Sequence, residues 1–142
     1  MTIHNAAQAS SSNTDNRLWQ KLWKVHSHPR CKDLIWLACK NILPVRANLL
    51  HRGVQVAPFC PLCGDKAEFV SHALLQCREV APVWFASPLS IHIPVQDEID
   101  FSTWLFYMIS NCDSSTTSTI FEISWALWGR RNDWVHNSRQ LL

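Results

Sequence analysis

Four residues able to bind a metal lie within an eighteen-residue stretch near the middle of the chain: Cys60, Cys63, His72 and Cys77. Two residues separate the first pair of thiols, as in a zinc knuckle, and Gly64 allows the backbone to turn after the second sulfur. Three thiolates and one imidazole fill the four positions of a tetrahedral zinc ion and leave none for water. The spacing therefore predicts one structural Zn2+ rather than a catalytic ion.

The cysteines also allow two alternatives without metal. They could be buried free thiols, which pack as small apolar side chains, or the six cysteines could pair in disulfides. The chain starts Met-Thr-Ile-His-Asn, with neither the basic nor the apolar region of a secretory signal, so we expect that it is not secreted. Reduced thiols in the nucleus or cytoplasm favour metal binding over disulfides.

A second metal site could be assembled from His26, His28, Cys31 and Cys39. Against it, Cys39 ends an apolar run in which a buried free thiol is the usual finding. Cys112 lies alone beside Ser and Thr residues and indicates no site. We therefore expect a single zinc ion per chain.

Helical periodicity surrounds the metal ligands. It predicts helices over residues 17–24, 32–41, 45–52, 97–109 and 116–137, with a further turn or two after Cys77. His72 is expected on a short helix from Glu68 to Cys77, with Cys77 about 140° further round an ideal helix and hence at its end. No alternating pattern supports a substantial sheet. We expect a mainly α fold: a small helical domain with a zinc-knuckle insert, a short extended hook and little or no sheet.

The last predicted helix has a wide apolar face. Phe121, Trp125 and Trp128 form a stripe at helical spacing, and Arg130 and Arg131 fall on the remaining polar arc. An aromatic stripe is more often part of a core than a platform for base stacking, so we expect this face to be buried.

The chain divides into three parts. Residues 1–16 are polar and aperiodic, which predicts a disordered tail. Residues 17–96 form the predicted helical zinc-binding domain, and residues 97–142 form a helical extension that packs on it. No apolar run approaches the roughly 20 residues that a membrane span requires, so we expect no membrane association.

Charge is distributed unevenly along the sequence. Residues 17–52 hold eight Lys and Arg residues against Asp33 alone, a net charge of +7, whereas residues 53–100 carry −4. A basic surface of this density can attract the phosphates of RNA or DNA. The candidate contacts are Lys21, Lys24, Arg30, Lys32, Lys40, Arg46 and Arg52. Charge alone does not separate this interpretation from an ordinary solvated helical surface.

Several segments, taken in order, resemble one known family. They are Trp19-Gln-Lys-Leu-Trp23, Leu34-Ile-Trp36, the run from Asn41 to Val54, the Cys60, Cys63, Glu68, His72 and Cys77 set, Val83-Trp84, and the run from Ile123 to Val135. This series is similar to the plant reverse-transcriptase zinc-binding domain of LINE-type, non-LTR retroelements. The module there follows the polymerase and often precedes a ribonuclease H domain. The resemblance implies a nuclear protein, and it implies Cys60, Cys63, His72 and Cys77 as the zinc ligands.

The sequence departs from the family pattern near these segments. Val45 stands where the family often has Thr, which removes a potential helix cap. Phe69 stands where Thr commonly follows the Glu, and His136 replaces a usual aromatic residue. None of these positions is a predicted ligand, so the departures affect local helix starts and leave the zinc prediction intact.

No enzymatic motif accompanies the zinc ligands. The sequence lacks paired aspartates in a strand setting, a Gly-rich phosphate loop and the dispersed carboxylates of a ribonuclease H. We therefore expect no catalytic activity. Two functions are compatible with the sequence: a module that contacts RNA or DNA through the basic 17–52 surface, or a structural domain that packs against polymerase or ribonuclease H domains and binds no nucleic acid itself.

Overall fold

The computed structural model describes residues 16–140 and is built almost entirely from helices. A helix over residues 16–24 is followed by α2 (Pro29–Cys39), α3 (Arg46–His51), η1 (His72–Gln76), α4 (Ala81–Ala86), α5 (Phe101–Asn111) and α6 (Ser114–Gln140). The extended structure within these residues is a single antiparallel bridge between Phe59 and Ala67. The mainly α prediction is confirmed. The predicted disordered tail lies outside the described residues, except for residue 16, which begins the first helix.

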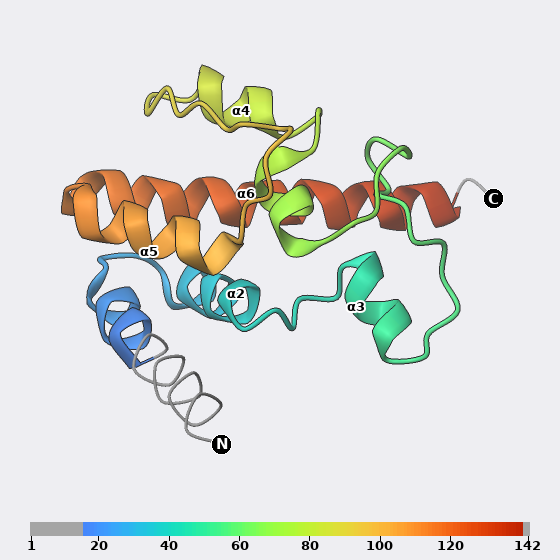
Figure 1. The fold of residues 1–142 in the computed structure, drawn as a ribbon, viewed down its shortest axis with the longest axis horizontal. Helices are drawn as coiled ribbons and strands as arrows, with labels where there is room; N and C mark the ends of the chain where they lie inside the picture. The colour runs from blue at the N-terminus through green and yellow to red at the C-terminus, as the bar shows by residue number, and fades with distance from the viewer. Residues whose placement is uncertain (1–15, 141–142) are drawn as a thin grey trace.

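The long helix α6 is the axis of the fold (Figure 1). Helices α2 and η1 both pack against it, and α5 packs against α2 and α6. Short helix α4 lies on the opposite side of α6 from α2 and α3 in this view, and it contacts η1. The core between these helices includes the fully buried side chains of Leu22, Ile35, Leu74, Leu75, Trp84, Leu105 and Phe121. Burying each such side chain contributes about 1.5–3 kcal/mol, so this core is the main source of stability. None of the described helices combines the length and apolarity that a bilayer span needs.

Capping residues explain where two helices begin. Pro29 is the first residue of α2, because proline lacks only an N–H that the first turn leaves unpaired. His28 is the N-cap, and its Nδ1 accepts from the Arg30 N–H at 3.1 Å. The helix predicted from residue 97 begins at Phe101, because the Asp100 carboxylate accepts from the Thr103 N–H at 3.0 Å and caps it there.

A distant carboxylate caps α3. Its N-cap residue, Val45, offers no side-chain acceptor, as the departure from the family pattern predicted. The Arg46 N–H instead donates to Glu68 Oε1 at 2.9 Å, and the Ala47 N–H donates to the Glu68 carbonyl at 3.0 Å. Glu68 therefore replaces the missing local cap from a position just before the helix that carries His72.

Glu68 also binds the long helix. Its side chain is fully buried and accepts from Arg131 of α6 through two bonds, Nε to Oε2 at 2.9 Å and Nη2 to Oε1 at 2.6 Å. The Arg131 guanidinium lies 4.9 Å from the centre of the Trp128 ring. The prediction that Arg131 lies on the polar arc of this helix is therefore wrong, because the buried carboxylate draws the cation inward. Arg130 is exposed as expected.

The predicted apolar stripe of α6 is only partly buried. Phe121 is fully buried and Trp128 is 8% exposed, but Trp125 is 42% exposed. Trp125 lies beside a surface hollow between α2 and α6. The expectation of a fully buried stripe is therefore wrong at this position, since no described element covers the outer edge of that face.

Removing either partner of the buried ion pair should destabilise the protein strongly. Glu68→Ala leaves the Arg131 charge buried without its partner, and Arg131→Ala does the same to Glu68. Each change should lower the free energy of unfolding by about 3–5 kcal/mol. The double variant should lose much less than the sum of the two losses. Urea unfolding of the zinc-loaded protein, followed by circular dichroism, measures all three variants.

Glu122→Ala supplies the matched control, because this glutamate lies exposed on the same helix. Its effect should stay within about 0.5 kcal/mol. Additive losses in the double variant would contradict the direct coupling of Glu68 and Arg131.

Candidate metal centre

The four predicted ligands meet at one point. One Sγ or ring nitrogen from each of Cys60, Cys63, His72 and Cys77 lies within 4.8 Å of all the others. The Cys60 and Cys77 sulfurs are 3.9 Å apart, and Cys63 Sγ is 3.4 Å from His72 Nε2. Tetrahedral zinc with Zn–S near 2.3 Å and Zn–N near 2.0–2.1 Å requires separations of about 3.8 Å between sulfurs and about 3.5 Å between sulfur and nitrogen. The residues fit one zinc ion and offer His72 Nε2 as its nitrogen ligand.

A short hook presents the first two sulfurs. The Phe59–Ala67 bridge closes its base, and the Cys60 N–H donates to the Lys66 carbonyl at 2.7 Å. Gly64 N–H donates to the Cys60 carbonyl at 2.8 Å, and its φ of +68° is one that side-chain-bearing residues rarely adopt. The sequence-based expectation of a knuckle turned by Gly64 matches this geometry.

A widened helical turn brings the other two ligands together. In η1 the Cys77 N–H donates to the carbonyl of His72, five residues earlier, at 2.9 Å. This π-type turn holds one residue more than an α-helical turn, so Cys77 lies closer to the His72 side than the 140° of an ideal helix allows. Cys77 ends the helix as predicted, but the π-turn itself had no recognisable signal in the sequence.

The surroundings of two of the three sulfurs, those of Cys60 and Cys63, favour the thiolate form that binds metal. A hydrogen bond from the Cys77 thiol lowers the pKa of Cys60 to about 3 despite the burial of Cys60. The same bond, together with burial, raises the pKa of Cys77. Partial burial opposes ionisation of Cys63, yet backbone N–H groups just after it lower its pKa. Burial would lower the pKa of His72, but hydrogen bonds to two thiols raise it. Zinc replaces the shared protons, since only deprotonated ligands coordinate it.

Side chains from outside the ligand set hold the hook in place. Arg78 Nη2 donates to the Cys63 carbonyl at 3.0 Å. Two contacts come from the exposed part of α6: Trp134 Nε1 donates to the Pro61 carbonyl at 2.9 Å, and Arg130 donates to the Glu79 carbonyl at 2.6 Å. The polar contact of Trp134 with the knuckle depends on the packing of α6, so no local pattern in the sequence indicates it.

The remaining cysteines do not form a second site. None of the six cysteines is in a disulfide, and the four-ligand group is the one His/Cys/Asp/Glu cluster of metal-binding geometry among the described residues. Cys31 is buried in the core, as a free thiol commonly is. His28 is engaged as the cap of α2.

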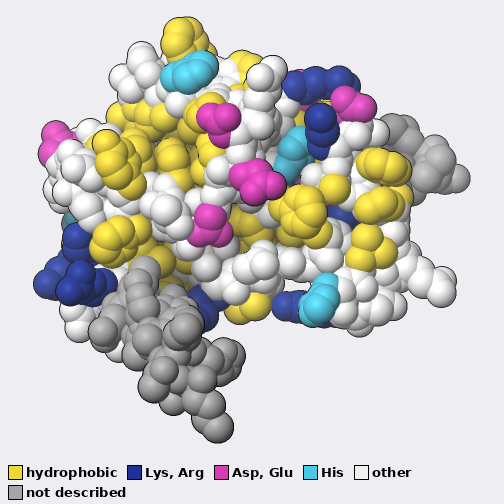
Figure 2. Space-filling model, viewed as in Figure 1, with side chains coloured by type: hydrophobic (Ala, Val, Ile, Leu, Met, Phe, Trp, Pro, Cys, Tyr) yellow, Lys and Arg dark blue, Asp and Glu magenta, His cyan; other side chains and the backbone are white. Residues whose placement is uncertain are grey.

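The seven predicted nucleic-acid contacts lie in three kinds of environment. Lys21, Lys32 and Lys40 place their ammonium groups 4.8, 5.7 and 5.4 Å from the ring centres of Phe106, Trp23 and Trp36, respectively. Lys24 and Arg30 are exposed and have no side-chain bond to a described residue. Arg52 is exposed and donates weakly to the Ile42 carbonyl at 3.5 Å, while Arg46 is half-buried. Basic side chains on the face drawn in Figure 2 form separate groups rather than one continuous patch.

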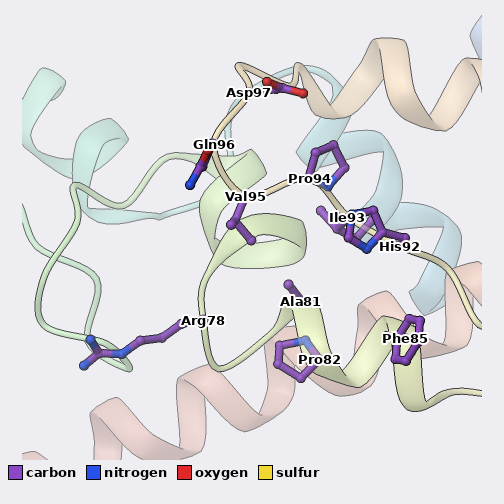
Figure 3. A pocket seen from close by; sticks show the side chains of 10 residues that line it. All are labelled: Arg78, Ala81, Pro82, Phe85, His92, Ile93, Pro94, Val95, Gln96 and Asp97. Carbon is purple, nitrogen blue, oxygen red and sulfur yellow. The ribbon is translucent and has the colours of Figure 1, made fainter.

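One surface hollow is lined by none of the four metal ligands. It encloses about 670 Å³ between α4 and the segment 92–97, and its wall is mainly apolar, with Pro82, Phe85 and Val95. Arg78, His92 and Asp97 reach it at separate edges (Figure 3). Acid–base catalysis requires ionisable groups that converge on one point, and these three do not.

Replacing a ligand should release the zinc. Cys60→Ser and Cys77→Ser should each reduce zinc content from about one ion per chain to near zero, because each removes a thiolate from a four-ligand site. Metal analysis by atomic absorption after gel filtration measures this. Loss of metal should also unfold the region 54–80, seen as loss of amide-exchange protection there.

Cys112→Ser is the control, since Cys112 is a half-exposed thiol outside the cluster. It should retain full zinc content. Unchanged zinc in Cys77→Ser would show that the fourth ligand has been misassigned.

Comparison with known families agrees with this geometry. A family model described as zinc-binding in reverse transcriptase matches residues 2–84, more than half of the 142-residue chain and the whole of the ligand set. No curated protein and no solved structure gave a match. The match ends within α4, so helices α5 and α6, which complete the core, lie beyond it. The chain belongs to the family of zinc-binding domains found in reverse transcriptases, and its Cys60, Cys63, His72 and Cys77 lie close enough together to hold one zinc ion.

Proposed function

We propose that this chain is a non-catalytic accessory module of a retroelement reverse transcriptase that contacts RNA or DNA through its basic segment, residues 17–52. Zinc stabilises the hook and the η1 turn and takes no part in chemistry, because the four ligands leave no position for water or substrate. The module would thereby hold template or product near the catalytic domains of a parent polyprotein.

One observation carries the nucleic-acid proposal: two lysines of this segment bond to neutral acceptors, and such bonds leave the positive charge in place. The ion pairs of Arg78 with Asp65 and Glu79, and of Arg131 with Glu68, lie outside residues 17–52. Lys32 donates to the Trp23 carbonyl at 3.0 Å, and Lys21 donates to Ser110 Oγ at 2.8 Å. Neutral acceptors of this kind fix a cation in place without cancelling its charge.

The segment carries a net charge of +7, and its exposed part, including Lys24 and Arg30, can attract phosphates. Phosphates that displace its counterions gain free energy from ion release, and this gain falls as salt rises. A surface that was merely solvated would bind nucleic acid weakly and without a steep salt dependence.

Binding to single-stranded RNA should depend strongly on salt. The double variant Lys24→Glu/Arg30→Glu changes two exposed side chains that bond to no described residue, so the fold should be retained. If both side chains contact phosphates, the slope of log K against log salt should lose about 1.4 in magnitude, at about 0.7 per contact. Fluorescence anisotropy between 25 and 200 mM salt measures the slope.

Lys66→Glu is the matched charge reversal outside the segment, on an exposed lysine of the hook. It should change the slope far less than the double variant does. Absence of binding at the lowest salt, or an affinity indifferent to salt, would contradict the proposal.

A second candidate function is protein docking, in which the domain packs against a polymerase or ribonuclease H domain. A hollow of about 540 Å³ between α2 and α6 favours it, with Leu37 38% and Trp125 42% exposed at its walls. Arg30, Asp33 and Asp133 supply charges of both signs around it. Such a mixed rim suits a protein surface better than a polyphosphate chain.

If this face docks a protein, the isolated chain should self-associate through it. Trp125→Ser should then reduce the weight-average mass seen by sedimentation at high protein concentration. A wild-type chain that stays monomeric and binds no hydrophobic dye would contradict the docking function.

A further inference from the structure

The helix over residues 16–24 carries a half-exposed tryptophan beside two others. Trp19 is 41% exposed and lies 4.9 Å from Trp23 and 4.3 Å from Trp36 of α2, centre to centre. Its plane makes angles of 66° and 70° with theirs, so neither neighbour stacks parallel to it. The edge contacts restrain the indole while much of its surface stays open to solvent.

Lysines lie over both rings that hold Trp19. The Lys32 ammonium is 5.7 Å from the centre of the Trp23 ring and is anchored by the Trp23 carbonyl. The Lys40 ammonium is 5.4 Å from the centre of the Trp36 ring. Two positive charges thus lie over the rings that Trp19 contacts, and they come from residues about one helical turn before and after Trp36.

We propose that Trp19 stacks against an unpaired base of single-stranded nucleic acid, with Lys32 and Lys40 contacting the adjoining phosphates. This inference rests on the proposed nucleic-acid function and adds to it the kind of strand and the residue that recognises it. Base faces are accessible in single strands and covered in a duplex, so stacking selects single strands. Every base has such a face, and the contact is therefore tolerant of sequence.

A purely structural role for Trp19 makes a different prediction. As a packing residue it would join the first helix to α2, and any large apolar side chain would serve. As a stacking platform it requires an aromatic ring. Trp19→Leu keeps apolar volume without the ring, whereas Trp19→Phe keeps a ring, so the pair of variants separates the two roles.

The test uses the full zinc-loaded chain and two labelled twelve-residue probes with equal phosphate numbers, oligo-uridine and an abasic backbone. Wild-type protein should bind oligo-uridine about 5- to 150-fold more tightly than the abasic probe, the range for one stacked base. Trp19→Leu should abolish that preference while leaving abasic binding and zinc content unchanged. Trp19→Phe should retain most of it, and Trp125→Ala, an exposed tryptophan on α6, should retain all of it.

The outcomes separate the two proposals. Binding to neither probe would overturn the nucleic-acid function and the stacking inference together. Salt-dependent binding of both probes with equal affinity would overturn stacking alone and leave phosphate contact standing. A preference that survives in Trp19→Leu would likewise overturn the role of Trp19. If Trp19→Leu loses zinc or fails to fold, the wild-type comparison of the two probes still decides whether a base is stacked.

Discussion

The buried carboxylate of Glu68 joins three parts of the chain that are far apart in sequence. Its carboxylate accepts a hydrogen bond from the first N–H of α3 and two more from Arg131 of α6. In the sequence, Glu68 lies between the ligand-bearing hook and η1. Removing a carboxylate from water costs several kcal/mol, and only a nearly complete set of partners offsets that cost. Because all these bonds are made in one arrangement of α3, the hook and α6, the burial of Glu68 selects that arrangement over other packings of the same apolar faces.

Zinc and Glu68 act on neighbouring residues by different means. The metal closes a loop from Cys60 to Cys77, and Glu68 fixes this loop to the long helix through Arg131. Trp134 and Arg130 add contacts to the carbonyls of Pro61 and Glu79 at the two sides of the loop. Residues of α6, which lies beyond the family match, thus hold the loop that carries the metal ligands in place.

Much of this arrangement follows from local patterns in the sequence. The ligands were predicted from their spacing, and the helices from apolar periodicity, because both signals depend on residues close together in the chain. The misplaced features depend on distant partners. Arg131 belongs by periodicity to the polar arc of α6, and only a carboxylate 63 positions away explains its burial. The π-turn between His72 and Cys77 likewise has no composition of its own, and Trp125 remains exposed because no described element covers it.

The central claim is that four protein ligands enclose a zinc ion that has a structural role only. X-ray absorption spectroscopy at the zinc edge of the purified protein tests it directly. A closed site predicts three sulfur neighbours near 2.3 Å and one nitrogen neighbour near 2.0–2.1 Å, with no oxygen. A first shell that contains a water oxygen, or only two sulfurs, would contradict a closed site and reopen the question of metal-based chemistry.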